Sequence, residues 1–252
     1  MPELALRAER LGKNFGGVRA VADLSIEIKR GEIHAVIGPN GAGKSTLINL
    51  LSGELAASTG EIRLGDTEIT GLAPDKRARA GIGRAFQKTT IFPRFTVHEN
   101  VRLAAQARSR APLRMFGGAS ADPEVQSRTM QAIGKAGLAG REAIVANVLS
   151  HGEQRQLEIA MVLATGPSII LLDEPLAGMG QAEARGIIAL IASLRAHHAV
   201  LIVEHDMDAV FELADKLTVM QDGQVIASGL PEDVRRHPAV RAAYLGNHGD
   251  AA

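Results

Sequence analysis

Residues 38–46 read Gly38-Pro39-Asn40-Gly41-Ala42-Gly43-Lys44-Ser45-Thr46, and this stretch decides the fold. It lies between residues 32–37, which end a predicted buried strand, and residues 45–51, whose apolar spacing is helical. The glycines allow consecutive backbone N–H groups to turn around the β- and γ-phosphates of a nucleotide, and the helix start adds a partial positive charge there. We therefore expect residues 38–46 to bind a nucleoside triphosphate, rather than to form a glycine-rich turn that binds nothing.

Two side chains of this loop have specific expected roles. Lys44 would reach the β- and γ-phosphates as a point charge, and the Ser45 hydroxyl would be a ligand of Mg²⁺.

A second apolar run, Ile169-Ile170-Leu171-Leu172, ends in Asp173-Glu174-Pro175. Four apolar residues followed by two carboxylates predict a parallel core strand that brings charge to its carboxyl end, where α/β sheets bind ligands. Asp173 suits the Mg²⁺ shell through water, because Mg²⁺ keeps several waters and takes few carboxylates. Glu174 is then free to act as general base or to orient an attacking water. A polar helix cap after the strand is the alternative interpretation.

A third segment reads Leu149-Ser150-His151-Gly152-Glu153-Gln154, and Ser150 lies 23 residues before Asp173. Ser150 and Glu153 form a Ser-x-x-Glu pair, which predicts a helix N-terminus. The segment resembles LSGGQ, the signature motif of ABC-transporter ATPases. The resemblance implies a dimer that sandwiches two ATP molecules, in which the signature residues Ser150, His151, Gly152 and Glu153 face the γ-phosphate bound by the opposite subunit.

Three further positions match this family in order and context. Gln87 falls where the family's glutamine senses the metal and the attacking water, and His205 falls at the switch histidine after the apolar run of residues 199–203. Phe15 lies where the family places an aromatic residue that stacks on adenine. A lone histidine after a strand is more often a surface or core residue, and core packing competes with the adenine role for Phe15.

Two departures from the family pattern stand out. His151 replaces the first signature glycine, and its imidazole could donate a hydrogen bond near the partner's phosphate or point to solvent, with solvent slightly favoured. Gly180 stands where many relatives carry an aspartate in the loop after Glu174, which puts in doubt communication between the two ATP sites through that carboxylate.

Composition sets limits on the function. The 252 residues carry 28 basic and 28 acidic side chains, so no global basic field points to nucleic acid. No apolar stretch approaches the ~18 residues that a membrane-spanning helix needs, and no long apolar leader opens the chain, so we expect a cytoplasmic protein. The absence of cysteine excludes disulfides and thiol catalysis.

The chain is organised as one domain, residues 1–252. β-rich patterns over 4–15, 21–28 and 32–37, short strands near 61–64 and 82–86, and alternating strands and helices after 168 predict an α/β fold. Asp122-Pro123-Glu124 predicts a helix start, and residues 109–121 predict a loop. With the resemblance, this implies a P-loop NTPase core (1–90 and 166–252) of mostly parallel sheet plus an N-terminal antiparallel β-subdomain, and an inserted α-helical subdomain (91–165) carrying the signature.

The segments 86–101 and 227–246 are similar to those of the branched-chain amino-acid importer ATPases, close to importers of urea and short amides. This resemblance implies the cofactors ATP and Mg²⁺, integral-membrane permease partners, and a homodimer or a heterodimer with a second ABC ATPase. It also implies an indirect link to a periplasmic solute-binding protein, a place on the inner face of the cell membrane, and no nucleic acid. The alternatives are the ATPase of another ABC system, such as a urea or amide importer or the lipopolysaccharide exporter, and a soluble regulatory ABC ATPase.

Overall fold

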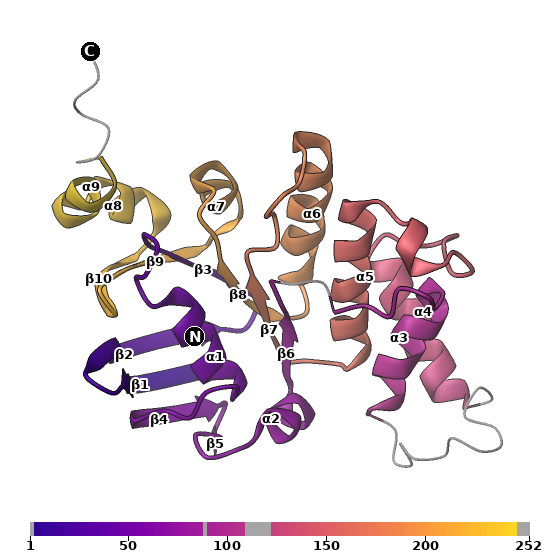
Figure 1. Cartoon of the computed structure of the whole chain (residues 1–252), viewed down its shortest axis with the longest axis horizontal. Coiled ribbons are helices and arrows are strands. Elements are labelled where there is room, and N and C mark those ends of the chain that lie inside the picture. Colours follow the sequence, from indigo (N-terminus) through magenta and orange to yellow (C-terminus); the bar gives the residue numbers. More distant parts are fainter. Residues whose placement is uncertain (1–2, 88–89, 109–121, 246–252) are drawn as a thin grey trace.

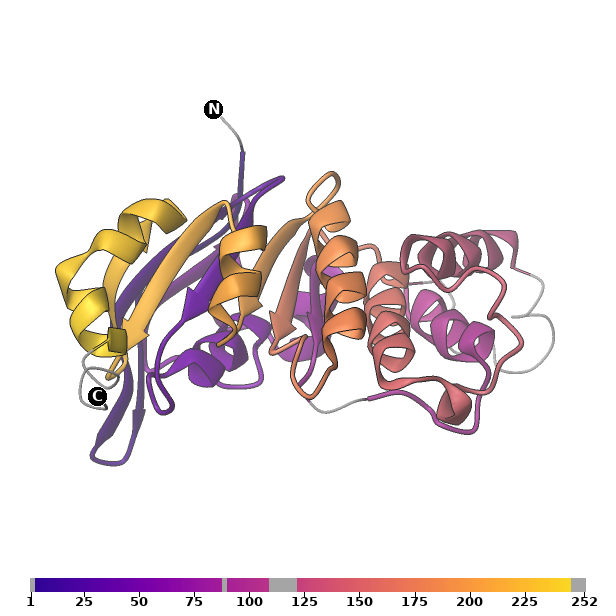
Figure 2. The same cartoon turned by 90° about the horizontal axis from the view of Figure 1, so that it is seen from above.

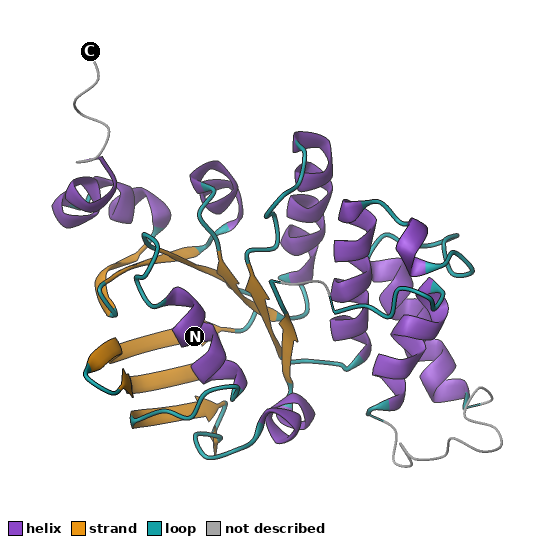
Figure 3. Ribbon diagram, viewed as in Figure 1, coloured by secondary structure: helices purple, strands orange, loops and turns teal. Residues whose placement is uncertain are grey.

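The structure, a computed structural model, describes residues 3–87, 90–108 and 122–245. Two sheets and the helices around them make up this part of the chain (Figures 1 and 3). The larger sheet has the strand order β10-β9-β3-β8-β7-β6. Its strands are β3 (Ile33–Ile37), β6 (Ile82–Ala85), β7 (Ile169–Asp173), β8 (Ala199–Val203), β9 (Lys216–Gln221) and β10 (Gln224–Gly229).

The centre of the larger sheet is parallel. β3 pairs with β8 and β9, and β7 pairs with β6 and β8, all in parallel, whereas β10 joins β9 in antiparallel orientation. Every residue of β3, β7 and β8 is buried, as expected of largely apolar strands in a sheet covered on both faces. The carboxyl ends of β3 and β7 therefore meet at one edge, where the loops after them begin.

The smaller sheet is antiparallel, in the order β2-β1-β4-β5. Its strands are β1 (Leu4–Phe15), β2 (Val18–Lys29), β4 (Thr59–Leu64) and β5 (Thr67–Glu68). Leu24, Ile26 and Ile28 of β2 are buried while Ser25 between them is exposed, which is the alternation of a sheet with one buried face. Helix α1 (Lys44–Ser52) packs its buried leucines into the core shared by the two sheets.

Helices α3 (Val97–Gln106), α4 (Pro123–Lys135) and α5 (His151–Ala164) lie together at one end of the molecule, with a short 3-10 turn at Ala146–Val148 before α5 (Figure 2). The short helices α8 (Pro231–Arg236) and α9 (Pro238–Leu245) lie at the opposite end. The structure also has α2 (Pro74–Ala80), α6 (Gln181–Leu194) and α7 (Met207–Leu213). Among the described residues, no helix has the length and apolarity needed to cross a bilayer.

Helix starts follow local sequence signals. Asp122 caps α4, as predicted, and accepts hydrogen bonds from Glu124 and Val125. Ser150 and Glu153 form the predicted capping box at the start of α5. The predicted fold is confirmed in its α/β architecture, parallel sheet and antiparallel N-terminal strands. Helix α2 and strand β5 were not predicted, and the predicted loop 109–121 lies outside the described residues.

Candidate nucleotide-binding and hydrolytic site

The loop of residues 38–46 is held tightly between strands of both sheets. Gly43 has φ +98°, and a Cβ there would lie 2.5 Å from the Ala20 carbonyl oxygen of β2. A Cβ on Gly38 would lie 2.3 Å from the Met220 carbonyl oxygen of β9. Only glycine fits these two backbone approaches, so the sequence pattern of the loop is required by its packing as well as by a phosphate.

Lys44 begins helix α1 and bends back over the loop. Its Nζ donates to the carbonyl oxygens of Gly38 at 2.6 Å and Pro39 at 3.0 Å. Burial lowers the pKa of Lys44, while the nearby carboxylates of Glu174 and Asp173 act in the opposite direction. The ammonium group is therefore buried in the loop and faces negative charge, whereas Ser45 beside it is exposed.

Gln87 and Glu174 are in direct contact. Gln87 Nε2 donates to Glu174 Oε2 at 2.8 Å, across 87 residues of sequence. Glu174 follows β7 with φ +46°, an unusual value for a residue with a side chain, and its N–H donates to Val203 at the end of β8. Strands β7 and β8 thus fix the backbone that aims this carboxylate at Gln87.

Asp173 is buried at the end of β7. Its Oδ2 accepts from Arg84 Nη2 at 3.3 Å. Burial raises the pKa of Asp173, and the Arg84 guanidinium counteracts that effect. Arg84, on β6, also donates to Ser52 Oγ at 2.8 Å, so it ties the end of α1 to the Asp173 carboxylate. Sequence reasoning missed Arg84.

The resemblance to ABC-transporter ATPases implies bound Mg²⁺, and the oxygen ligands that the chain offers can be compared with those that Mg²⁺ needs. No three His, Asp or Glu side chains converge as a cation cage within the described part of the chain. Mg²⁺ does not need such a cage, because it takes one or two carboxylates with substrate phosphates and waters. One buried carboxylate, Asp173, at the strand edge and the Ser45 hydroxyl at the helix start are therefore a suitable protein contribution.

His205 and Phe15 are both exposed. The His205 side chain is 65% accessible, and its backbone N–H donates to Glu204 Oε2 at 3.0 Å. Glu204 is fully buried, and its other oxygen accepts from the Leu176 N–H at 2.9 Å, so it joins the loop after β8 to the loop after β7. Phe15 is 48% accessible at the end of β1, on the hairpin whose β2 strand contacts Gly43. Sequence reasoning missed Glu204.

The signature residues form a second group, around the start of α6. The Gly152 N–H donates to Glu183 Oε1 at 3.0 Å. Hydrogen bonds from the backbones of Gly152 and Gly180 and from Ser150 lower the pKa of Glu183. His151 is exposed, and its Cε1 would lie 3.7 Å from a Cβ placed on Gly178. A carboxylate of the same chain thus occupies a backbone donor at the N-terminus of α5. Glu183 also escaped prediction, because nothing in its sequence surroundings indicates a contact with residue 152.

The structure therefore brings eight of the predicted residues together in two sets, whereas the exposed side chains of Phe15, Ser45 and His205 belong to neither. Contacts or electrostatic interactions link Lys44, Gln87, Asp173 and Glu174 at the carboxyl ends of β3 and β7. Ser150, His151, Gly152 and Glu153 lie at the start of α5 against the loop and helix that follow β7.

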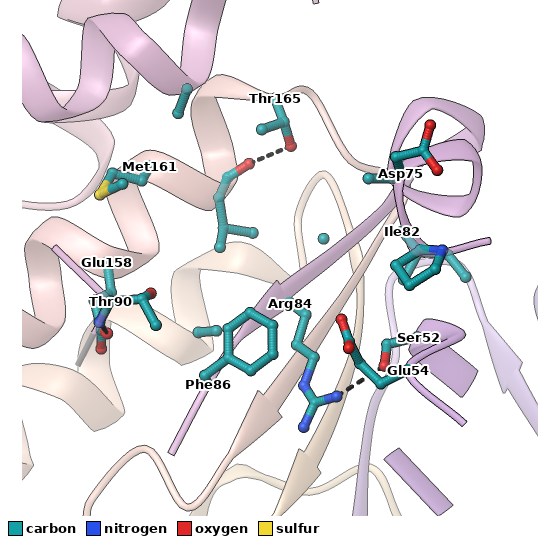
Figure 4. Close-up of a pocket in the computed structure, with 16 residues that line it drawn as sticks. Ser52, Glu54, Asp75, Ile82, Arg84, Phe86, Thr90, Glu158, Met161 and Thr165 are labelled. Atoms are coloured by element: carbon teal, nitrogen blue, oxygen red, sulfur yellow. Dashed lines mark hydrogen bonds between the residues drawn. The ribbon is translucent and has the colours of Figure 1, made fainter. Parts of the chain in front are cut away.

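A cavity of about 370 Å³ lies between β6, α2 and α5 (Figure 4). Glu54, Asp75 and Arg84 line it on one side, and Glu158 and Met161 of α5 on the other. The Phe86 ring lies under the Arg84 guanidinium, 4.5 Å from its centre, just before Gln87. The cavity wall thus includes Phe86, the residue before Gln87, and contains residues of both the larger sheet and the three-helix group.

Comparisons with known proteins agree with this geometry. The family model described as ABC transporter matches residues 21–177, and the model described as branched-chain amino acid ATP-binding cassette transporter matches residues 224–250. The chain is 37% identical to the high-affinity branched-chain amino acid transport ATP-binding protein LivG of Salmonella typhimurium, over 98% of this chain and 99% of LivG. It is also 37% identical to BraF of Pseudomonas aeruginosa, which has the same description, over 96% and 97%.

Solved structures show the same fold. The ADP conformation of MJ1267, an ATP-binding cassette of an ABC transporter, matches with a TM-score of 0.86 and 32% identity, over 96% of this chain and 99% of that one. The dimeric post-hydrolysis state of the cassette MJ0796, bound to ADP and Pi, matches with a TM-score of 0.76 and 26% identity, over 90% and 98%. The loop at residues 38–46, the Gln87–Glu174 contact and the similarity along the whole chain lead to one conclusion: the chain belongs to the ABC transporter family and is an ABC-type ATPase.

Proposed function

We propose that the chain energises the uptake of branched-chain amino acids, or of related small amino acids and amides, through membrane permease partners. The observation that carries the hydrolytic part is the 2.8 Å contact between Gln87 and Glu174, close to the Lys44 ammonium group. The cargo part is supported by the full-length similarity to LivG and BraF and by the match of residues 224–250.

In this proposal ATP lies in the loop of residues 38–46, with Lys44 at its phosphates and Phe15 against its adenine. Ser45, Asp173 and Gln87 would hold Mg²⁺, which when bound neutralises phosphate charge. Glu174 polarises a water molecule for in-line attack on the γ-phosphate and receives its proton, and Gln87 orients that water. His205 donates a hydrogen bond to the developing charge. Catalysis by these residues consists of positioning and electrostatic stabilisation.

The signature residues act across a dimer interface. Ser150, His151, Gly152 and Glu153 would contact the nucleotide held by the other subunit, where the N-terminus of α5 attracts the γ-phosphate. The dimeric MJ0796 structure supports such an assembly. The partner is a second copy of this chain or a related ABC ATPase. ATP closes the dimer, and hydrolysis reopens it.

The cavity beside Phe86 is a suitable contact for a permease. Residues of both the core (1–90 and 166–252) and the helical subdomain (91–165) line it, so relative movement of these two parts would displace a permease segment bound there. The protein would act on the cytoplasmic face of the membrane, and a periplasmic solute-binding protein would deliver cargo to the same permeases without touching this chain.

Uptake of radiolabelled leucine tests the proposal. Cells that lack the gene should lose high-affinity leucine uptake, and the wild-type chain should restore it while Glu174→Gln, which is nearly isosteric, should not. Normal leucine uptake with loss of urea or amide uptake would move the cargo to that alternative. A defect confined to lipopolysaccharide export, or no transport defect at all, would contradict the importer role.

A further inference from the structure

Arg155 lies on α5, five residues after Ser150, and only 7% of its side chain is exposed. Its guanidinium donates to four backbone carbonyls outside α5. These are Phe86 at 2.7 Å, Glu174 at 2.9 Å, Pro175 at 3.2 Å and Asp173 at 3.4 Å. One side chain of the signature helix therefore holds both the segment before Gln87 and the end of β7.

Glu158, one turn further along α5, completes the arrangement. Its Oε2 accepts from Arg155 Nη1 at 2.7 Å, and its Oε1 accepts from the Thr90 N–H at 2.7 Å. Burial raises the pKa of Glu158, and Arg155 counteracts that effect. The pair is thus hydrogen-bonded to the chain on both sides of Gln87, at the Phe86 carbonyl and at the Thr90 N–H. Neither residue has a role in the hydrolytic step described above.

The contact with Glu174 has a particular consequence for the carboxylate. A residue with a side chain at φ +46° is held there by its surroundings, because the conformation itself is unfavourable. The Glu174 N–H is bonded to Val203, and its C=O is bonded to Arg155. A change in the position of Arg155 therefore changes the direction of the Glu174 side chain, and through Phe86 it also changes the position of Gln87.

We propose that Arg155 is a positioning residue that couples the signature helix to the Gln87–Glu174 pair of the same chain. This inference rests on the proposed function, in which the start of α5 binds the nucleotide of the neighbouring site. Engagement of that nucleotide moves α5, and the guanidinium passes the movement to the hydrolytic pair of its own site. The route does not use residue 180, where this chain carries glycine instead of a carboxylate.

A purely structural role of Arg155 and the proposed positioning role predict different effects of mutation, and a double variant distinguishes them. Arg155→Met leaves Glu158 buried without its partner, so it should destabilise the fold. Arg155→Met combined with Glu158→Met replaces the pair with two apolar side chains of similar length and should recover much of that stability. Arg155→Lys keeps the charge but cannot bond several carbonyls in one plane. Arg128→Lys, in the exposed pair with Glu124 on α4, is the matched control.

The measurements are the melting temperature, the affinity of a fluorescent ATP analogue, and the kcat, KM and Hill coefficient of ATP hydrolysis. We expect the double variant to melt between Arg155→Met and the wild type, because the backbone groups that Arg155 and Glu158 bond stay unpaired. It should bind the analogue within about twofold of the wild type. Its kcat should be about 10- to 100-fold lower, because the reacting groups are misplaced. Its Hill coefficient should be near 1, because the signature helix is no longer coupled to the Gln87–Glu174 pair. Arg128→Lys should match the wild type.

Two outcomes would overturn the inference: recovery of wild-type kcat and Hill coefficient together with stability in the double variant, or wild-type kinetics in Arg155→Lys. Failure of the proposed function has a separate signature. In that case the wild-type protein itself would neither hydrolyse ATP cooperatively nor form an ATP-dependent dimer.

Discussion

Two glycines in the nucleotide loop allow a matched test of how tightly this loop is built. Gly41 and Gly43 have similar positive φ values, +84° and +98°. A Cβ on Gly41 would meet no atom within 4 Å, whereas a Cβ on Gly43 would lie 2.5 Å from the backbone oxygen of Ala20. Alanine at either position suffers the same kind of backbone strain, but only at Gly43 must the β1–β2 hairpin also move.

The difference can be given a magnitude. A side chain in a left-handed backbone conformation costs roughly 1–2 kcal/mol, so Gly41→Ala should lower the free energy of unfolding by about that amount. Gly43→Ala adds an overpacking term of about 1–3 kcal/mol, because a backbone carbonyl cannot move aside as a flexible side chain can. The expected total for Gly43→Ala is about 2–5 kcal/mol.

Urea unfolding of the nucleotide-free protein, followed by circular dichroism, gives both values under the same conditions. Working without nucleotide removes any effect of the new methyl groups on bound phosphate. Equal destabilisation by the two substitutions would refute the conclusion that the close approach of β2 adds strain at residue 43.

Three further predictions concern charge. Glu174→Gln should bind ATP with wild-type affinity but lower kcat by about 10²- to 10⁴-fold, whereas Lys44→Ala should weaken nucleotide binding itself; equilibrium titration and steady-state kinetics distinguish them. His34 is a fully buried residue of β3, and this burial lowers its pKa from 6.5 to about 3. The unfolded chain therefore binds the extra proton between these values, and stability should fall by about 2 kcal/mol from pH 7 to pH 5. Urea unfolding of His34→Gln should show a smaller loss over that interval. Glu183→Ala frees the Gly152 N–H at the start of α5, so ATP-driven dimers, measured by size-exclusion chromatography in the Glu174→Gln background, should form at lower ATP concentration. An unchanged or higher ATP requirement would contradict that expectation.

Local sequence signals were sufficient for most of the fold. The apolar runs predicted β3, β7 and β8 because a fully buried parallel strand must be apolar on both faces. Ser150 and Asp122 predicted helix starts because their side chains cap the backbone a few residues away. Helix α2 gave no comparable signal: it is seven residues long, and its one buried residue is Arg77, which bonds carbonyls of Leu50 and Leu51 in α1.

The supporting residues of the site could not be predicted in the same way. Arg155 is hydrogen-bonded to Phe86, 69 residues away in the sequence, and Glu204 is hydrogen-bonded to Leu176, 28 residues away. Only the tertiary fold brings these partners together. A weak signal existed in α5, where Arg155 and Glu158 interrupt an otherwise apolar buried face at a spacing that favours an ion pair. Glycine requirements were predicted for a phosphate, but the backbone approaches of Ala20 and Met220 appear only in the folded chain.

The importer role is tested most directly by identifying the chains that the Glu174→Gln variant recovers from membranes. The tagged variant is purified from detergent-solubilised membranes with ATP and Mg²⁺, and the bound chains are identified by mass spectrometry, with Lys44→Ala combined with Glu174→Gln as the control that cannot hold nucleotide. We expect permeases with several membrane spans in the first sample, together with a second copy of this chain or a related ABC ATPase. The control should recover less of the second ATPase copy. Recovery of a self-dimer alone, from the soluble fraction and without permeases, would rule out the importer role.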